Sequence, residues 1–209
     1  MAFDEAMLGA VPRLQAPVLR FYSWTQPAAT FGYFQKFQEV ERLTALRPLV
    51  RRPTAGGIVP HDADWTYSLA FPTGNEWHGL KAVESYRRVH EWLCLAFRHL
   101  GVATEVASCC LKSAPGECFV GHEQYDLLWQ GRKVAGAAQR RTRQGLLIQG
   151  SVQPPPIQIL RSDWEGAMCH AQQGESVRWI KLEPDAELLG TVDVLESTKY
   201  ALDSHNRKR

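Results

Sequence analysis

The segment 117–151 constrains the fold most, because it holds two strand-like runs joined by a turn signal. The first run, Tyr125 to Trp129, ends in Gln130-Gly131, and the small-residue run Lys133 to Gln139 follows it. This pattern predicts a β-hairpin. Its glycine and alanines would let a bulky ligand or another backbone come close. We therefore expect a sheet with a groove, with Lys133 just past the turn and Cys118 on the loop that enters the first strand.

Elsewhere, β-branched and aromatic runs predict further strands, and apolar residues at every third or fourth position predict helices. The predicted strands are 17–22, 28–33, 49–52, 65–71, 104–108 and 146–152, and the predicted helices are 2–11, 37–46, 80–100, 157–172 and 184–200. Gly101 follows the longest helix and supplies a stop. This order of elements predicts an α+β fold, with mixed or antiparallel sheets flanked by helices, in a single domain that spans residues 1–209.

Composition and charge exclude several classes of protein. A chain of 209 residues can form one large domain with a full core, and a net charge of +2 gives no reason to expect a polyanion partner such as nucleic acid. No apolar run approaches the ~20 residues of a membrane span, and no leader opens the chain. Five scattered cysteines, an odd number without Cys-x-x-Cys spacing, argue against a disulfide framework and a metal site. We expect a cytoplasmic protein without a bound metal.

The first candidate motif runs from Arg51 to His61 and pairs two arginines with Gly56-Gly57. Guanidinium groups fork onto carboxylate or phosphate, and glycine lets backbone N–H groups approach a ligand, so the motif suits an anionic or acyl-carrying ligand. A strand-to-strand turn with surface arginines explains the same residues, and His61 alone is typical of a hydrogen-bonded structural histidine. Composition leaves both interpretations open.

The second candidate is Cys118 together with Lys133. A lone cysteine is usually a small buried hydrophobe, but Cys118 follows Pro115 and Gly116 on a loop, where a thiol can meet a substrate. Lysine in a strand is usually solvated. The residues that follow Lys133 carry no counter-charge, so burial of its ammonium would call for a functional explanation.

Six blocks of the sequence, in this order, resemble the biotin/lipoate protein ligase and lipoyl(octanoyl)transferase superfamily. They are Leu19 to Trp24, Phe31 to Gln35, Arg51 to Gly57, Thr66 to Ser68, Glu117 to Phe119 and Gly131 to Arg140. The resemblance covers nearly the whole chain, to about residue 205, and the Arg-Lys-Val-Ala-Gly-Ala-Ala-Gln block is its most specific part.

Within that superfamily, the cysteine-phenylalanine pair upstream of the lysine resembles the octanoyltransferases that use a cysteine–lysine dyad. The resemblance implies that Cys118 is the acyl-thioester nucleophile and Lys133 its activator. It also implies an acyl-binding pocket, lined by Arg52, Gly56, Gly57, His61, Gly136 and Ala137.

The sequence departs from the family pattern at three places. Ala55 stands where the family usually has a first glycine, which could shift a position of positive φ. Gln149 stands where a histidine is common before the glycine-serine pair. The chain begins in what resembles the family's first helix, so the strand that normally precedes this helix is expected to be missing.

Thiol chemistry supports the implied dyad. An ordinary thiol with a pKa of about 8.5 is only ~3% thiolate at pH 7, and a nearby ammonium that lowers the pKa to about 6.5 makes it roughly 75% thiolate. Acyl exchange between thiols is nearly balanced in energy, and the later attack by an amine gives a stable amide. Such a transfer needs no nucleotide or other cofactor.

The resemblance therefore implies octanoyl transfer from acyl carrier protein to a lipoyl domain or a glycine-cleavage H-type protein, by a monomer. An ATP- and Mg-dependent lipoate or biotin ligase is the alternative, in which the loop from Arg51 to Gly57 and Lys133 hold an acyl-adenylate. A chain that ends near residue 209 leaves no room for the accessory C-terminal domain of many lipoate ligases, which argues against it. A third hypothesis is an inactive carrier-binding paralogue.

Overall fold

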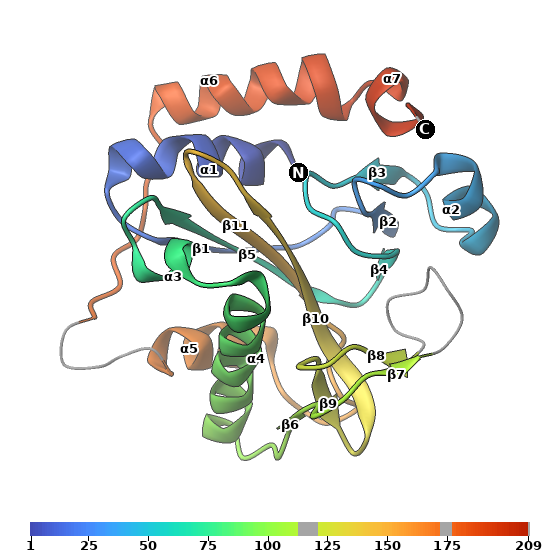
Figure 1. Ribbon diagram of the computed structural model, residues 1–209, viewed down its shortest axis with the longest axis vertical. Coiled ribbons are helices and arrows are strands. Elements are labelled where there is room, and N and C mark those ends of the chain that lie inside the picture. Colours follow the sequence, from blue (N-terminus) through green and yellow to red (C-terminus); the bar gives the residue numbers. More distant parts are fainter. Residues whose placement is uncertain (113–120, 172–176, 209) are drawn as a thin grey trace.

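The computed structural model describes residues 1–112, 121–171 and 177–208 (Figure 1). Its largest sheet is antiparallel throughout and has six strands. In spatial order they are β1 (Val18–Tyr22), β5 (Trp65–Pro72), β11 (Gly145–Val152), β10 (Arg132–Arg141), β9 (Leu127–Trp129) and β6 (Glu105–Val106). The predicted hairpin is formed by β9 and β10, and Gln130 and Gly131 take φ values of 49° and 73° in the turn. Two positive φ values suit the right-handed twist of a hairpin, so the turn signal is confirmed.

A second sheet of three strands lies over one end of the first. Its central strand is β2 (Ala28–Phe31), which pairs in parallel with β3 (Leu49–Arg51) and antiparallel with β4 (Val59–His61). A short hairpin of β7 (Leu111–Lys112) and β8 (Gly121–His122) stands apart from both. Mixed and antiparallel sheets are thus confirmed. Strand β4 was not predicted, because Pro60 argues against a strand, although proline is tolerated on an edge strand such as this one.

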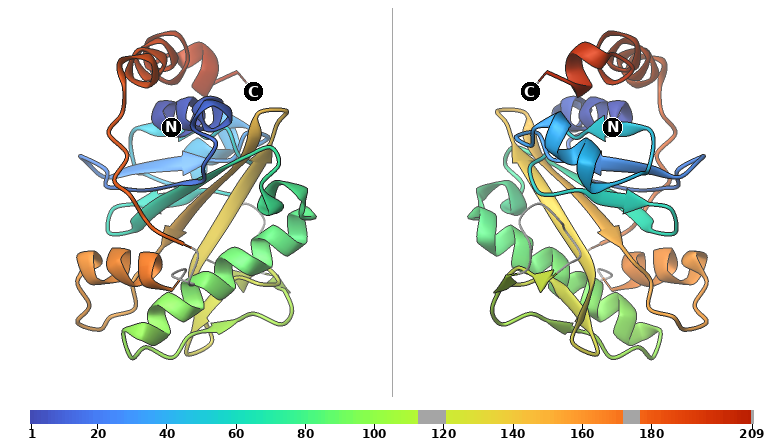
Figure 2. Two further views of the ribbon diagram at one scale, coloured as in Figure 1. Left: turned by 90° about the vertical axis from the view of Figure 1, so that its left-hand side faces the viewer. Right: turned by 90° about the vertical axis from the view of Figure 1, so that its right-hand side faces the viewer.

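Helices cover both faces of the large sheet (Figures 1 and 2). The described helices are α1 (Ala2–Leu14), α2 (Phe37–Leu43), α3 (Glu76–Gly79), α4 (Ala82–His99), α5 (Arg161–His170), α6 (Ala186–Leu195), the π-helix η1 (Glu196–Tyr200) and α7 (Asp203–Asn206). Of these, α2 and α7 contact the small sheet. Helices α4 and α5 pack on one face, whereas α1 packs on part of the other and carries α6 on its outer side. None of the described helices combines the length and apolar character needed to cross a bilayer.

Strand alternation explains which face of the sheet becomes core. On β5, the alternate residues Trp65, Tyr67, Leu69 and Phe71 point toward α4 and α5. There they meet the buried apolar side chains of α4, which recur at every third or fourth position. Each fully buried side chain of this size stabilises the fold by about 1.5–3 kcal/mol. The intervening residues of β5 face α1 and the small sheet. That second face is covered by α1 at one end only, and the small sheet covers the remainder.

Candidate active site

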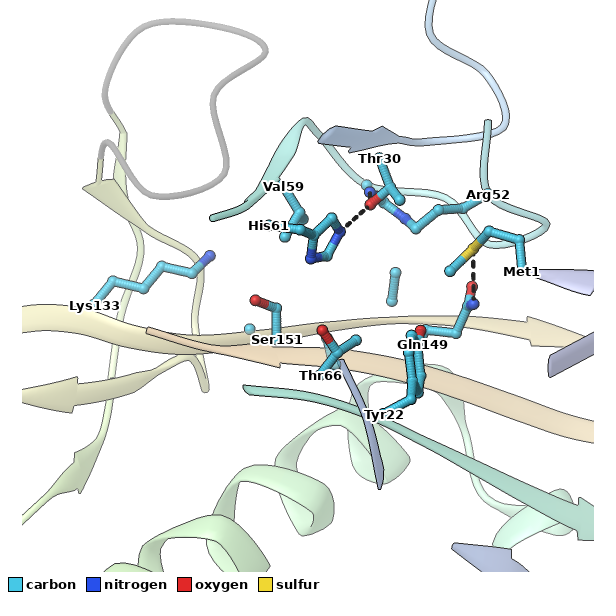
Figure 3. A pocket seen from close by; sticks show the side chains of 15 residues that line it. Met1, Tyr22, Thr30, Arg52, Val59, His61, Thr66, Lys133, Gln149 and Ser151 are labelled. Atoms are coloured by element: carbon cyan, nitrogen blue, oxygen red, sulfur yellow. Dashed lines mark hydrogen bonds between the residues drawn. The ribbon is translucent and has the colours of Figure 1, made fainter. Parts of the chain in front are cut away.

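A cavity lies between the two sheets, with the small sheet on one side and strands β5, β10 and β11 on the other (Figure 3). About 50 Å³ of it admits the centre of a water molecule, and its empty space is about 490 Å³ when the open solvent at its mouth is included. Lys133 reaches in from one end, and Met1 and Gln149 lie at the other. The lining residues are Met1, Tyr22, Thr30, Arg52, Gly56, Val59, His61, Thr66, Lys133, Gly136, Ala137, Ala138, Gln149, Gly150 and Ser151. The small-residue run of β10 therefore does form part of a groove, as predicted.

The position of Lys133 depends on a β-bulge. In a regular strand, residues three apart point to opposite faces, which would separate Lys133 from Gly136. The β9–β10 register shifts between Lys133 and Ala135, so one extra residue is inserted here and the lysine turns to the face of Gly136. A Cβ added to Gly136 would lie 2.9 Å from Lys133 Cε and 3.0 Å from Nζ. Glycine at this position leaves the space that the lysine side chain occupies.

Asp126 provides the counter-charge that the sequence neighbours of Lys133 lack. Its Oδ2 lies 2.8 Å from Lys133 Nζ, and the lysine and aspartate side chains are 8% and 0% exposed. The same oxygen accepts the backbone N–H of Glu123 (2.7 Å), and Oδ1 accepts the hydroxyl of Tyr86 from α4. The counter-charge comes from outside the sequence neighbours of Lys133, because the chain turns just before β9 and brings Asp126 beside β10.

Arg52 organises the loop that follows β3. Its Nη2 donates to the carbonyl oxygens of Ala55 (2.9 Å) and Gly57 (2.8 Å), and its Nη1 donates to Thr30 Oγ1 (2.9 Å). The guanidinium is thus held against the cavity wall, at 5% exposure for the residue. Gly57 contributes this carbonyl but is not among the described lining residues, whereas Arg52 and Gly56 both line the cavity as predicted.

The loop 52–57 approaches the end of β2 so closely that only glycine fits there. A Cβ on Gly32 would lie 2.0 Å from the carbonyl oxygen of Gly56, and Gly56 itself takes a φ of 93°. The required positive φ therefore falls on Gly56. Ala55 does not adopt one, so the alanine at the first position of the Ala-Gly-Gly stretch is compatible with this loop.

Arg51 has a structural role, contrary to the idea that both arginines meet an anion. It is fully buried, and its guanidinium donates to carbonyl oxygens of Tyr33 (2.8 Å), Gln35 (2.7 Å), His205 (3.2 Å) and Asn206 (3.1 Å). Consecutive residues of a strand point to opposite faces, so only one of the two arginines can face the cavity. Arg51 ties α7 to the small sheet.

His61 belongs to a buried polar network in the cavity wall. Its Nδ1 lies 2.8 Å from Asp64 Oδ2, its Nε2 lies 2.8 Å from Thr30 Oγ1, and its ring stacks on Trp24 at 4.3 Å between centroids. Asp64 Oδ2 also accepts from Ser151 Oγ (2.7 Å) and Thr66 Oγ1 (3.0 Å). Both ring nitrogens are engaged within the protein, so His61 shapes the pocket, which agrees with the structural interpretation of a lone histidine.

Gln149 closes the far end of the cavity through its amide. The amide nitrogen donates to Asp4 Oδ2 (2.7 Å), and its oxygen accepts from Thr54 Oγ1 (2.7 Å). Asp4 is completely buried and also accepts from Ser68 Oγ (2.8 Å) and from Arg20 Nη1 (2.8 Å). The glutamine that departs from the family pattern is thus fully hydrogen-bonded, and its presence is compatible with a closed pocket.

The structure brings together most of the predicted site residues. Those that line one cavity are Lys133, Arg52, Gly56, His61, Gly136 and Ala137. Cys118 lies outside the described residues, within the gap between Lys112 and Gly121, so its predicted role stays a prediction. The described cysteines are free thiols, and none of them lines the cavity.

Sequence reasoning missed the polar residues that share the cavity face of the large sheet. Thr66 on β5, and Gln149 and Ser151 on β11, alternate with apolar core residues. Polar side chains at alternate positions of a strand whose other residues are apolar indicate that the two faces differ. This alternation in 65–71 and 146–152 was the available signal for a polar-walled site.

Comparison with protein families matches residues 1–153 to the model described as the lipoyl protein ligase A/B catalytic domain. Among curated relatives, octanoyltransferase LipM of Carboxydothermus hydrogenoformans is 39% identical over 158 residues, which are 73% of this chain and 59% of that protein. Octanoyltransferase LipM of Exiguobacterium sibiricum is 38% identical over 192 residues, 85% of this chain and 67% of that protein. The chain thus spans about three fifths of the length of the first of these relatives.

Solved structures with the same fold include lipoate-protein ligase A bound with ATP, with a TM-score of 0.80 and 18% identity, over 99% of this chain and 92% of that one. The bipartite lipoate protein ligase of Thermoplasma acidophilum superposes with a TM-score of 0.75 and 18% identity, over 99% and 89% of the two chains. At this identity the likeness shows the fold alone.

Proposed function

The chain belongs to the lipoyl protein ligase A/B catalytic domain family, and we propose that it transfers an octanoyl group to a lysine side chain of a lipoyl-accepting protein. The observation that carries the proposal is a cavity that ends at Lys133, which is paired with Asp126, in a chain whose curated relatives are named octanoyltransferases. The donor we propose is octanoyl acyl carrier protein. The acceptor we propose is a lipoyl domain or a glycine-cleavage H-type protein.

The cavity suits a linear acyl chain. Small residues on β10 line an elongated space, and the polar groups in its wall bond to one another, as the links from His61 through Asp64 to Ser151 illustrate. An alkyl chain therefore meets satisfied polar groups. Each methylene that leaves water contributes about 0.8 kcal/mol, so a chain two methylenes shorter should lose about 1.6 kcal/mol, roughly 15-fold in kcat/KM.

In the proposed first step, the thiolate of Cys118 attacks the carbonyl carbon of the octanoyl thioester. The new carbon–sulfur bond to Cys118 forms as the bond to the carrier sulfur breaks, and the departing carrier thiolate takes a proton from the Lys133 ammonium. In the second step, the neutral amine of the acceptor lysine attacks the Cys118 thioester. The amide forms, Lys133 takes the proton that this amine releases, and Cys118 returns as thiolate.

The reaction as proposed consumes no nucleotide. Mixing the full chain with octanoyl carrier protein in the absence of ATP, followed by intact mass measurement, should show one added octanoyl group. Addition of a lipoyl domain should then move that group to the domain. If modification of the lipoyl domain instead requires free octanoate and ATP, the protein is a ligase. If the protein binds the carrier but transfers no acyl group, either from the carrier or from octanoate and ATP, it is an inactive paralogue. The cytoplasmic location and the monomeric state stay predictions from the sequence.

A further inference from the structure

Asp126 lies behind Lys133 as seen from the cavity. Its side chain is completely buried and is not among the described residues that line the cavity, whereas the lysine to which it is bound does line it. A substrate in the cavity would therefore meet the Lys133 ammonium, and Asp126 can influence the reaction only through this lysine.

The surroundings of Asp126 hold its carboxylate in one place. Tyr86 of α4 donates its hydroxyl to Oδ1, and the Glu123 N–H donates to Oδ2. The turn before β9 is fixed by two backbone hydrogen bonds: the Tyr125 N–H donates to the Ala107 carbonyl oxygen, and the Ala107 N–H donates to the Asp126 carbonyl oxygen. Tyr125 takes a φ of 74°. A non-glycine residue adopts such a φ at a cost on the order of 1–2 kcal/mol, and strain of this kind clusters at functional sites.

Among the described residues, Lys133 supplies the positive charge beside Asp126, and the neighbouring Tyr86, Tyr67 and His90 are neutral at pH 7. Burial, with the Asp126 charge and its hydrogen bond, raises the pKa of Tyr86 well above its usual value. Burial lowers the pKa of His90, also on α4, to about 4. Burial likewise raises the pKa of Tyr67 on β5, near Tyr86. Across the cavity, the His61 ring is occupied by Thr30 and Asp64.

We propose that Asp126 is a positioning residue, which holds the Lys133 ammonium over Gly136 at the cavity end. The inference rests on the proposed acyl transfer. In the first step the ammonium gives its proton to the carrier thiolate, and the lysine amine is then held by the same carboxylate. In the second step the carboxylate favours return of the proton from the attacking amine, because a nearby negative charge stabilises the ammonium form.

Trace labelling of Lys133 tests this without relying on activity. The full chain is exposed to a small amount of acetic anhydride at a series of pH values, and acetylation of Lys133 is read by peptide mass mapping. Only the neutral amine reacts, so the labelling midpoint reports when the ammonium loses its proton. Asp126→Asn should lower this midpoint by at least one pH unit, which is about tenfold more labelling at a given pH below it.

Gly136→Ala is the second variant, in case Asp126→Asn does not fold. Its Cβ would lie 2.9 Å from Lys133 Cε and 3.3 Å from Asp126 Oδ1, so it should push the two charges apart and lower the midpoint by at least half a unit. Asp4→Asn is the matched control. It removes another completely buried carboxylate at the far end of the cavity and should leave the Lys133 midpoint in place.

The inference is overturned if the Lys133 labelling midpoint in folded Asp126→Asn and in Gly136→Ala equals the parental midpoint. It is also overturned if Asp4→Asn shifts the midpoint by the same amount. The single-turnover rate of octanoyl transfer is measured against pH in parallel, and its midpoint in Asp126→Asn should move with the labelling midpoint. If the parent protein transfers no octanoyl group, the proposed function fails, while the labelling midpoints still decide whether Asp126 controls the lysine.

Discussion

Substitution of Gly136 by alanine tests whether the position of the Lys133 ammonium matters for acyl transfer. The alanine Cβ would be 2.9 Å from Lys133 Cε and 3.0 Å from Nζ, whereas ordinary contacts are 3.4–4 Å. The end of the lysine side chain must therefore move by at least about 0.5 Å. Because both contacts involve the flexible end of a side chain, the variant should still fold, at a cost of about 1–3 kcal/mol for the added methyl group.

A shift of this size should also lower the rate of octanoyl transfer. The pair of Lys133 Nζ and Asp126 Oδ2 starts at 2.8 Å, so a displacement of 0.5–1 Å takes it out of hydrogen-bond range. Misplacement of a reacting group by about 1 Å can cost 10²-fold in rate, and we expect octanoyl transfer by Gly136→Ala to slow by 10- to 100-fold.

Quenched-flow mass measurement of octanoyl transfer, together with thermal unfolding, provides the assay. Gly166→Ala is the control, because Gly166 lies within α5 and an added Cβ there meets no atom within 4 Å. This control should transfer at the parental rate and gain about 0.5–1 kcal/mol in stability from the lower chain entropy of alanine. A Gly136→Ala variant that transfers at the parental rate would refute the argument from lysine position.

Cys118→Ala should abolish the octanoyl thioester, and peptide mapping of the parent protein should place the acyl mass on Cys118. An acyl mass on Cys169 would contradict the assignment, since burial and the charge of Glu165 raise the pKa of that thiol. Lys133→Arg should still form some thioester but transfer the acyl group slowly, because guanidinium does not give up its proton. Lys133→Ala should raise the pH midpoint of Cys118 alkylation toward about 8.5, and an unchanged midpoint would contradict the dyad. His90 has a pKa lowered from 6.5 to about 4, so its contribution to the free energy of unfolding is complete above pH 6.5 and is lost as the pH falls to 4, by about 3 kcal/mol. Denaturant unfolding of His90→Phe should lack this part of the pH dependence, and a slope equal to that of the parent would contradict it.

The elements that were predicted well have a local cause. Helix α4 was expected from apolar residues at every third or fourth position, and the β9–β10 hairpin from Gln130-Gly131, because these signals act within a few residues of one another. The short strands β4, β7 and β8 have two or three residues each, too few for alternation to be visible. Such strands are stabilised by partners distant in sequence, as Ala28 of β2 pairs with His61 of β4.

Predictions for the site succeeded where the residue type carried the information. Gly56 was expected to allow a special backbone conformation, and Gly136 a close approach, and both do so. The two arginines show the limit of composition, since Arg51 and Arg52 look alike in the sequence. Because side chains alternate along the chain, Arg52 points to the cavity wall and Arg51 points to α7. The orientation of β3 in its sheet decides which arginine takes which position.

The Lys133–Asp126 pair shows why a site can be named from sequence while its electrostatics cannot. The two residues are seven positions apart, with Asp126 just before β9 and Lys133 on β10, and these strands meet in a register that shifts between Lys133 and Ala135. Without this bulge the lysine would point to the opposite face from Gly136, and its ammonium would leave the cavity. The bulge, the glycine and the buried carboxylate therefore act as one unit. Substitution of Gly136 or of Asp126 should therefore alter the protonation of Lys133, although Gly136 borders the cavity and Asp126 does not.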